Sequence, residues 1–139
     1  MKKTFRNAVV LVAVASMGAV AGAAYVRAHQ SGAPALETLM RAELAGADST
    51  EVILSHVKLP PGLTLPLHYH PGEEIVLLLE GSAVHVEEGK PDRAMVAGER
   101  VVIPAGAIHQ PRIGSDGAHI VIIYLVPKGE EVTIPAPET

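Results

Sequence analysis

The 139-residue chain is long enough for one domain and has a globular composition, with 48% hydrophobic and 19% charged residues. It contains no cysteine, which excludes disulfides, thiolate catalysis, Cys-ligated zinc and iron–sulfur clusters. The formal net charge of −4 argues against a nucleic-acid-binding protein that relies on a basic surface. Because aromatic residues make up only 3% of the chain, its core must consist of Val, Ile, Leu and Ala.

Residues 1–28 differ in composition from the rest of the chain. A basic start at Lys2, Lys3 and Arg6 precedes an apolar run over 8–20, and small residues at 21–23 and 26–28 fit an A-x-A-like cleavage site. This order is typical of a secretory signal peptide. The alternative is a membrane anchor, since the uncharged stretch is just long enough to span a bilayer.

Under either interpretation the folded part is exported, and we expect a periplasmic or secreted protein. Cleavage after residue 28 would leave 7 Lys and Arg against 15 Asp and Glu, a formal charge of −8. Such an acidic protein is not expected to bind nucleic acid, and it would contact a membrane only through an uncleaved N-terminus.

The remaining chain is predicted to be all-β. We expect a linker and N-terminal segment over 29–50, a barrel over 51–127 and a frayed tail over 128–139, with a short helix or an irregular segment at 36–45. Short β-like runs end at Pro and Gly clusters throughout the barrel. They cover 51–59, 65–69, 74–79, 83–87, 94–96, 100–103, 108–113 and 118–126. Many short strands with regular turn signals indicate a sandwich or barrel.

Two of these runs, 75–79 and 120–123, are apolar on both faces. A strand with one wet face would alternate apolar and polar residues, so both faces of these strands must be covered. We therefore expect a homodimer that packs through the outer sheet face. The competing explanation is that segment 35–47 folds back over that face.

Four side chains form a candidate metal site. On a strand, His68 and His70 project to the same face, and the turn at 71–72 lets Glu74 return over them. His109 follows a second turn at 104–106. Three imidazoles and a carboxylate suit Fe, Mn, Ni, Cu or Zn, and the ligand types alone do not choose among these metals. Glu73 remains a substitute ligand.

The spacing of these residues resembles the two sequence motifs of the cupin family. The first motif, G-x5-H-x-H-x3,4-E-x6-G, is filled by Gly62, His68, His70, Glu74 and Gly81. The second, G-x5-P-x-G-x2-H-x3-N, is matched in register by Gly98, Pro104, Gly106 and His109, with Ile113 in place of the final Asn. The resemblance covers roughly residues 51–126.

The resemblance implies a double-stranded β-helix, a small jelly-roll barrel that encloses one divalent metal held by His68, His70, Glu74 and His109. It also implies two functions. The first is a mononuclear metal enzyme, dioxygenase-like or an isomerase or lyase, that acts on a small organic substrate, with Glu74 as ligand or general base. The second is a non-catalytic module that binds a metal or small ligand.

The other polar residues are not expected to bind the metal. We expect His85 to face outward because it lies between two valines, and we expect His56 and His119 to be ordinary strand or surface histidines. Gln110 and Tyr124 are candidates to reach the cavity, which we expect to be aliphatic. Arg112 is the nearest candidate for holding a phosphate, so a phosphosugar substrate is disfavoured.

Overall fold

The computed structural model describes residues 33–137, which fold into eight β-strands without a helix. No helix in this part of the chain is long and apolar enough to cross a membrane. The signal-peptide or anchor prediction for 1–28 lies outside the described residues. The all-β expectation is confirmed.

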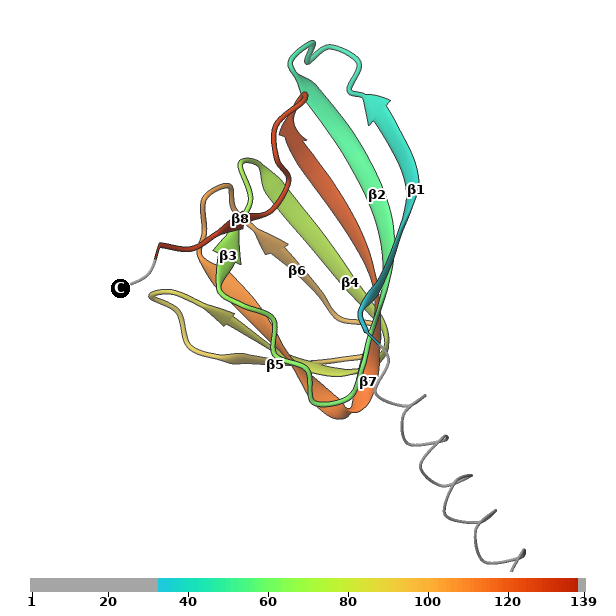
Figure 1. The fold of residues 1–139 in the computed structure, drawn as a ribbon, viewed down its shortest axis with the longest axis vertical. Helices are drawn as coiled ribbons and strands as arrows, with labels where there is room; N and C mark the ends of the chain where they lie inside the picture. The colour runs from blue at the N-terminus through green and yellow to red at the C-terminus, as the bar shows by residue number, and fades with distance from the viewer. Residues whose placement is uncertain (1–32, 138–139) are drawn as a thin grey trace, which may run out of the picture. The chain divides into compact units, whose positions relative to one another are not determined.

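The strands form a single curled sheet (Figure 1). In chain order they are β1 (Ala35–Glu43), β2 (Thr50–Leu59), β3 (His68–Tyr69), β4 (Glu73–Glu87), β5 (Arg93–Val96), β6 (Arg100–Ile103), β7 (His109–Pro127) and β8 (Ile134–Pro135). β7 is central and pairs antiparallel with β2, β3 and β4; β1 extends the sheet beyond β2, β8 pairs with β3, and β5 and β6 pair with β4.

β4 and β7 are each continuous where the sequence predicted two strands with a break between them. Both bend at the expected break, and the ladder between them shifts register around Gly81. Gly81 and Gly117 have φ values of 82° and 77°, and a Cβ built on Gly81 would lie 2.0 Å from the carbonyl oxygen of Gly117. Glycine at these positions therefore allows two long strands to fold over together and close the sheet around an interior.

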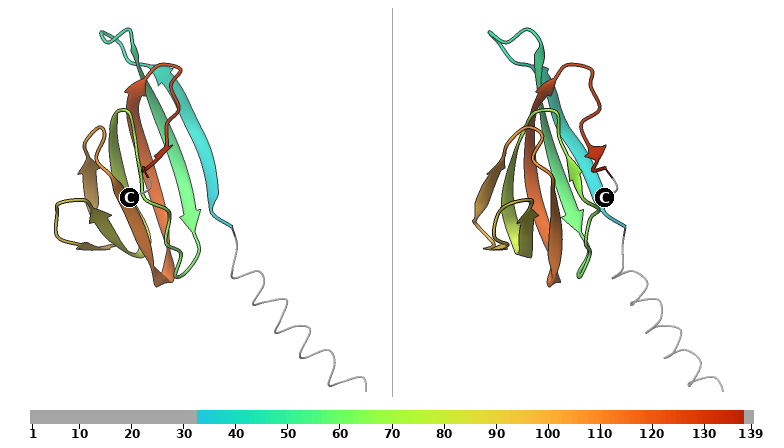
Figure 2. Two further views of the ribbon diagram at one scale, coloured as in Figure 1. Left: turned by 60° about the vertical axis from the view of Figure 1, so that its left-hand side comes forward. Right: turned by 90° about the vertical axis from the view of Figure 1, so that its left-hand side faces the viewer.

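The two faces of the sheet differ in burial because the sheet curls around one of them (Figure 2). Along β2 and β7 buried residues alternate with partly exposed ones, and β4 supplies the most buried core leucine, Leu78. The buried positions form one hydrophobic core: Ile53, Val57, Leu59, Leu78, Met95, Ile113, Ala118, Ile120, Ile122, Tyr124 and Val126. We call this the interior face and the other the outer face.

Both chain ends of the domain contradict the sequence prediction. Residues 36–45 are not a helix, because 35–43 form the edge strand β1, which pairs with β2 over its full length. The pairing of β1 with β2 shifts by one residue at a bulge between Thr38 and Met40. The tail is not simply frayed either, because Ile134 and Pro135 pair with the strand that carries His68. Backbone pairing overrides local propensity at both places.

Candidate metal centre

The sheet brings together the three histidines that the sequence separated. His68 and His70 flank Tyr69 on and just after β3, and His109 begins β7 directly opposite His68. Glu74 follows the 71–72 turn on β4, with its side chain on the interior face. The four motif glycines Gly62, Gly81, Gly98 and Gly106 all have positive φ values, which glycine adopts readily at turns.

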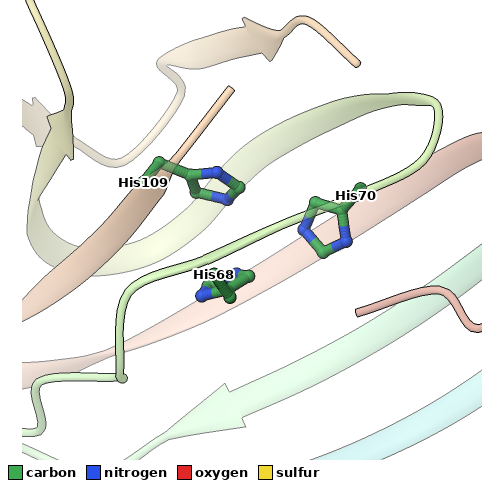
Figure 3. A group of neighbouring side chains, drawn as sticks. All are labelled: His68, His70 and His109. Atoms are coloured by element: carbon green, nitrogen blue, oxygen red, sulfur yellow. The ribbon is translucent and has the colours of Figure 1, made fainter. Parts of the chain in front are cut away.

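The three imidazoles face one another (Figure 3). One ring nitrogen from each of His68, His70 and His109 lies within 4.8 Å of the others, a spacing at which all three could hold one metal ion. Glu74 Oε2 is 3.1 Å from Nε2 of His70 and 3.1 Å from Nε2 of His109. The three histidines thus form one group that could bind a metal ion, and Glu74 lies beside two of them.

Backbone carbonyls orient each imidazole. Nδ1 of His68 donates to the carbonyl of Pro66 at 2.7 Å, Nδ1 of His70 to Val132 at 2.6 Å, and Nδ1 of His109 to Ala107 at 2.9 Å. A proton on Nδ1 leaves a lone pair on Nε2, the atom that points into the cluster. Second-shell hydrogen bonds of this kind hold metal-binding histidines in the required tautomer.

Two polar atoms at the centre of the cluster have no hydrogen-bond partner. Despite their 3.1 Å separation, the buried atoms His70 Nε2 and Glu74 Oε2 have no hydrogen-bond partner with adequate geometry. Imidazole and carboxylate lone pairs converge here in a buried space. Such an arrangement favours a cation that all of them can bind. A divalent transition metal fits this donor set.

Electrostatics keep Glu74 ionised. Burial alone would raise its pKa, but interaction with the imidazoles of His109 and His70 outweighs burial and holds the pKa at about 2. The pKa of His109 is raised despite burial because Glu74 lies beside it. Burial lowers the pKa of His68 and favours its neutral form. Glu74 and His68 therefore favour the protonation states that metal ligands require, whereas His109 would have to lose a proton when a metal binds.

The cluster opens onto a cavity of about 460 Å³ inside the sheet. His68, Glu74 and His109 line one part of it, and its remaining wall is mostly aliphatic, as expected. Tyr124 also lines the cavity, with its ring centroid 4.9 Å from that of His70, while Gln110 is not among the lining residues. Burial and the charge of Glu74 raise the pKa of Tyr124, so its hydroxyl keeps its proton.

His85 was predicted incorrectly, because it faces the interior. It is only 9% exposed and lines the cavity, with its ring centroid 5.8 Å from that of His109. Its Nε2 lies 3.2 Å from the buried carboxylate of Glu87, which pairs at 2.6 Å with Lys90. The sequence signal that could have found it is the H-x-E pair on one strand face, because His85 and Glu87 are two residues apart.

The remaining candidate residues all lie outside the metal cluster. Glu73 is exposed, as expected, and lies outside the cluster. Arg112 is exposed and pairs with Asp92, and no Lys or Arg is among the described residues that line the cavity. His56 and His119 are not isolated: they lie on the outer face in contact with each other.

The family of the chain follows from a comparison with known proteins. The model of the cupin domain matches residues 55–126, more than half of the chain. The chain is a cupin. The matched range contains all four residues of the cluster and both bent strands, which agrees with the resemblance seen in the motifs.

One relative of this cupin has a named activity. Over 56 residues it is 43% identical to the dimethylsulfoniopropionate lyase DddQ of Ruegeria pomeroyi, a match that covers 40% of this chain and 28% of the lyase. The crystal structure of that lyase superposes with a TM-score of 0.62 at 29% identity, covering 76% of this cupin and 54% of the lyase chain. The cupin therefore corresponds to only part of the lyase.

More distant structures show the fold alone. A cupin-like protein from Thermotoga maritima superposes with a TM-score of 0.60 at 24% identity, covering 77% of this chain and 78% of its own. The polyketide cyclase RemF from Streptomyces resistomycificus gives a TM-score of 0.59 at 20% identity, covering 76% and 72%. Cupin jelly rolls of this size thus share the architecture described above.

Proposed function

We propose that this cupin is a mononuclear metal enzyme whose divalent ion is held by His68, His70, Glu74 and His109. The observation that carries the proposal is the buried cluster of unsatisfied lone pairs at the wall of an aliphatic cavity. Four protein ligands leave positions for a substrate or water on a five- or six-coordinate ion, and a bound ion there would act as a Lewis acid.

The protein's own groups would bind and orient the substrate. The aliphatic wall excludes water and favours a small, largely apolar molecule. The Tyr124 hydroxyl keeps its proton and would be available to donate a hydrogen bond to a substrate in the cavity. His85 offers a second polar contact: Glu87 accepts the proton on Nε2, which leaves Nδ1 as an acceptor in that tautomer.

Within this class we propose lyase chemistry on a small organic acid, because the relative with a named activity is a lyase. The carboxylate of such an acid would bind the metal ion, since no Lys or Arg is among the described residues that line the cavity, and the rest of the molecule would contact the aliphatic wall. An elimination needs a base near the bond that breaks and a Lewis acid for the developing negative charge. A dioxygenase uses the same ligand set and is the second candidate. A binding module without catalysis is the third.

The experiment combines metal analysis with activity. The wild-type protein, purified without a metal-affinity step and dialysed exhaustively, is expected to retain one transition-metal ion per chain, and His68→Ala/His70→Ala is expected to retain less than about a tenth of that amount. An unchanged metal content in the double variant would place the ion elsewhere.

Activity is then measured on dimethylsulfoniopropionate and related small acids, with oxygen uptake followed in parallel on phenols and diketones. Lyase chemistry predicts turnover without oxygen consumption, and oxygen uptake would favour the dioxygenase candidate. Tight metal binding without turnover across the panel would favour the binding module.

We also propose that the protein is exported by its N-terminal segment. The support is the basic start, the apolar run and the A-x-A sites of the sequence. N-terminal sequencing of the periplasmic or secreted protein is expected to begin after residue 23 or residue 28. Recovery of the full-length chain from the soluble cytoplasm would refute export.

Finally, we propose a homodimer formed through an outer apolar patch. Its aliphatic side chains come from β2, β4, β6 and β7, and its central register row is Leu54, Ile123, Ile75 and Val102. Segment 35–47 does not cover this patch, since β1 lies beside β2 as an edge strand. A second copy presents the same patch, and two flat apolar patches can pack across a two-fold axis.

Light scattering at micromolar concentration is expected to give the mass of two chains. Leu77→Glu on the outer face should give the mass of one chain with metal still bound, whereas Arg93→Glu, away from the patch, should leave the mass unchanged. A wild-type mass of one chain would reject the dimer.

A further inference from the structure

A row of four ionisable side chains crosses the outer face, on the opposite side of the sheet from the candidate metal centre. It contains Glu37 on β1, His56 on β2, His119 on β7 and Glu80 on β4. Both histidines lie between buried residues of their strands, so their own side chains project outward. We call these four residues the outer row.

Strand register places the outer row side by side. Glu37 lies directly opposite His56, and Glu80 lies directly opposite His119. His56 is opposite Val121 and His119 is opposite Lys58, so the two histidines are diagonal neighbours across the β2–β7 ladder. Diagonal neighbours in a sheet lie within reach of long side chains.

Side chains of the outer row contact one another. The two Nε2 atoms contact each other, with the ring centroids 4.2 Å apart and the rings tilted by 57°. On the far side of His119, Nδ1 is 3.7 Å from Glu80 Oε2. A carboxylate beside Nδ1 favours the proton on that nitrogen, which leaves the Nε2 lone pair directed at His56.

The two Nε2 atoms are direct neighbours, so they can share one proton or, once the side chains rotate slightly apart, ligate one metal ion. Paired imidazole nitrogens select borderline divalent ions such as Zn²⁺, Cu²⁺ and Ni²⁺ over Mg²⁺ and Ca²⁺, which prefer oxygen ligands. The carboxylates at both ends of the row add negative charge, which favours a cation. The outer row lies beside the proposed dimer patch, and both histidines are partly exposed in the single chain, so water would complete the coordination on the side that the patch does not occupy.

We propose that His56 and His119 form a second metal-binding site for Zn²⁺, Cu²⁺ or Ni²⁺ on the outer face, with Glu80 orienting His119 and Glu37 flanking His56. This site is independent of the proposed enzyme function, because it shares no residue with the interior cluster. It binds more weakly than the interior site, since it has two imidazole ligands and they are partly exposed.

The test is a calorimetric titration with Ni²⁺ of the wild-type protein that retains its interior metal. One further equivalent is expected to bind. His119→Ala and His56→Ala are each expected to weaken this binding at least ~10-fold. Glu80→Gln is expected to weaken it only a few-fold, less than the ~10-fold lower end of outer-shell effects, because Glu80 is exposed and 3.7 Å from His119. Lys58→Ala, opposite His119 on the same face, is the matched control and should bind the ion at least as tightly.

A second measurement locates the ion. Paramagnetic Ni²⁺ is expected to broaden the imidazole proton resonances of His56 and His119 before those of other residues, both in the wild-type protein and in His68→Ala/His70→Ala. Absence of the further equivalent would overturn the proposal and leave a shared proton only. An equivalent that binds equally well to His119→Ala would also overturn it.

Discussion

The interior and outer faces of β2, β4 and β7 carry the same kinds of side chain, aliphatic residues and histidines, but they organise them differently. On the interior face each histidine of the candidate metal centre is fixed through Nδ1 by a backbone carbonyl, and the buried carboxylate of Glu74 contacts two of them. On the outer face the two histidines are held only by each other and by the exposed Glu80. Backbone anchoring and burial, rather than residue type, therefore distinguish a preorganised centre from an adaptable surface pair.

The largest expected difference between the faces concerns two adjacent leucines. Leu78 is 1% exposed on the interior face, whereas Leu79 is 41% exposed. Leu78→Ala is expected to reduce the free energy of unfolding by about 2–5 kcal/mol because it leaves a cavity in the core. Leu79→Ala should cost about 1 kcal/mol or less. Urea unfolding measures both, and equal losses would show that the two faces are buried alike.

Metal removal is expected to have the next largest effect. A ligand that binds only the folded state at 100 times its dissociation constant stabilises that state by about 2.7 kcal/mol. Chelation should therefore lower the unfolding free energy of the wild-type protein by about this amount. His119→Ala should show the full loss, and His68→Ala/His70→Ala should show none. A loss that persists in the interior double variant would contradict the proposed centre.

The smallest expected effect is a pH window in the metal-free protein. The folded pKa of Glu74, about 2, lies below its ordinary value of 4.5, so its contribution to stability is present above pH 4.5 and is lost as the pH falls toward 2. The pKa of His109 is raised, so its contribution is complete below pH 6.5 and is lost as the pH rises through the folded pKa. The pair therefore stabilises the protein most between pH 4.5 and 6.5.

The measurement compares the unfolding of wild type and Glu74→Gln in chelator at pH 3, 5.5 and 8. The difference between the two proteins is expected to peak at pH 5.5, by on the order of 1 kcal/mol, which is the free energy of about one pKa unit. A difference for Glu74→Gln that does not vary with pH would reject the coupling of Glu74 to His109.

The sequence was sufficient to predict the strands of the barrel and the four members of the interior cluster, because strand alternation and the cupin spacing act over short distances. It did not predict the orientation of His85. Counting alternate residues from the buried Glu74 places His85 outside, but the bulge between Leu78 and Glu80 shifts the alternation by one residue. A bulge is a property of the paired strands and is not visible in one strand alone.

The contact between His56 and His119 was missed for a related reason. The two residues are 63 positions apart, and their proximity depends on the register of β2 against β7. The strand β1 was also missed, since its leucine spacing fits a helix until β2 supplies hydrogen bonds along its full length. Long-range pairing accounts for each of these errors.

The hydrogen bond from His70 Nδ1 to the carbonyl of Val132 has a consequence for the order in which the protein is made. His68, His70 and Glu74 leave the ribosome well before His109, and the carbonyl that orients His70 is synthesised later still. The site is therefore complete only after all of these segments have been made and their strands have paired. Because affinity alone discriminates poorly among the transition metals, local availability chooses the ion. If the proposed metal site and export are correct, the compartment in which folding is completed would determine which metal this cupin binds.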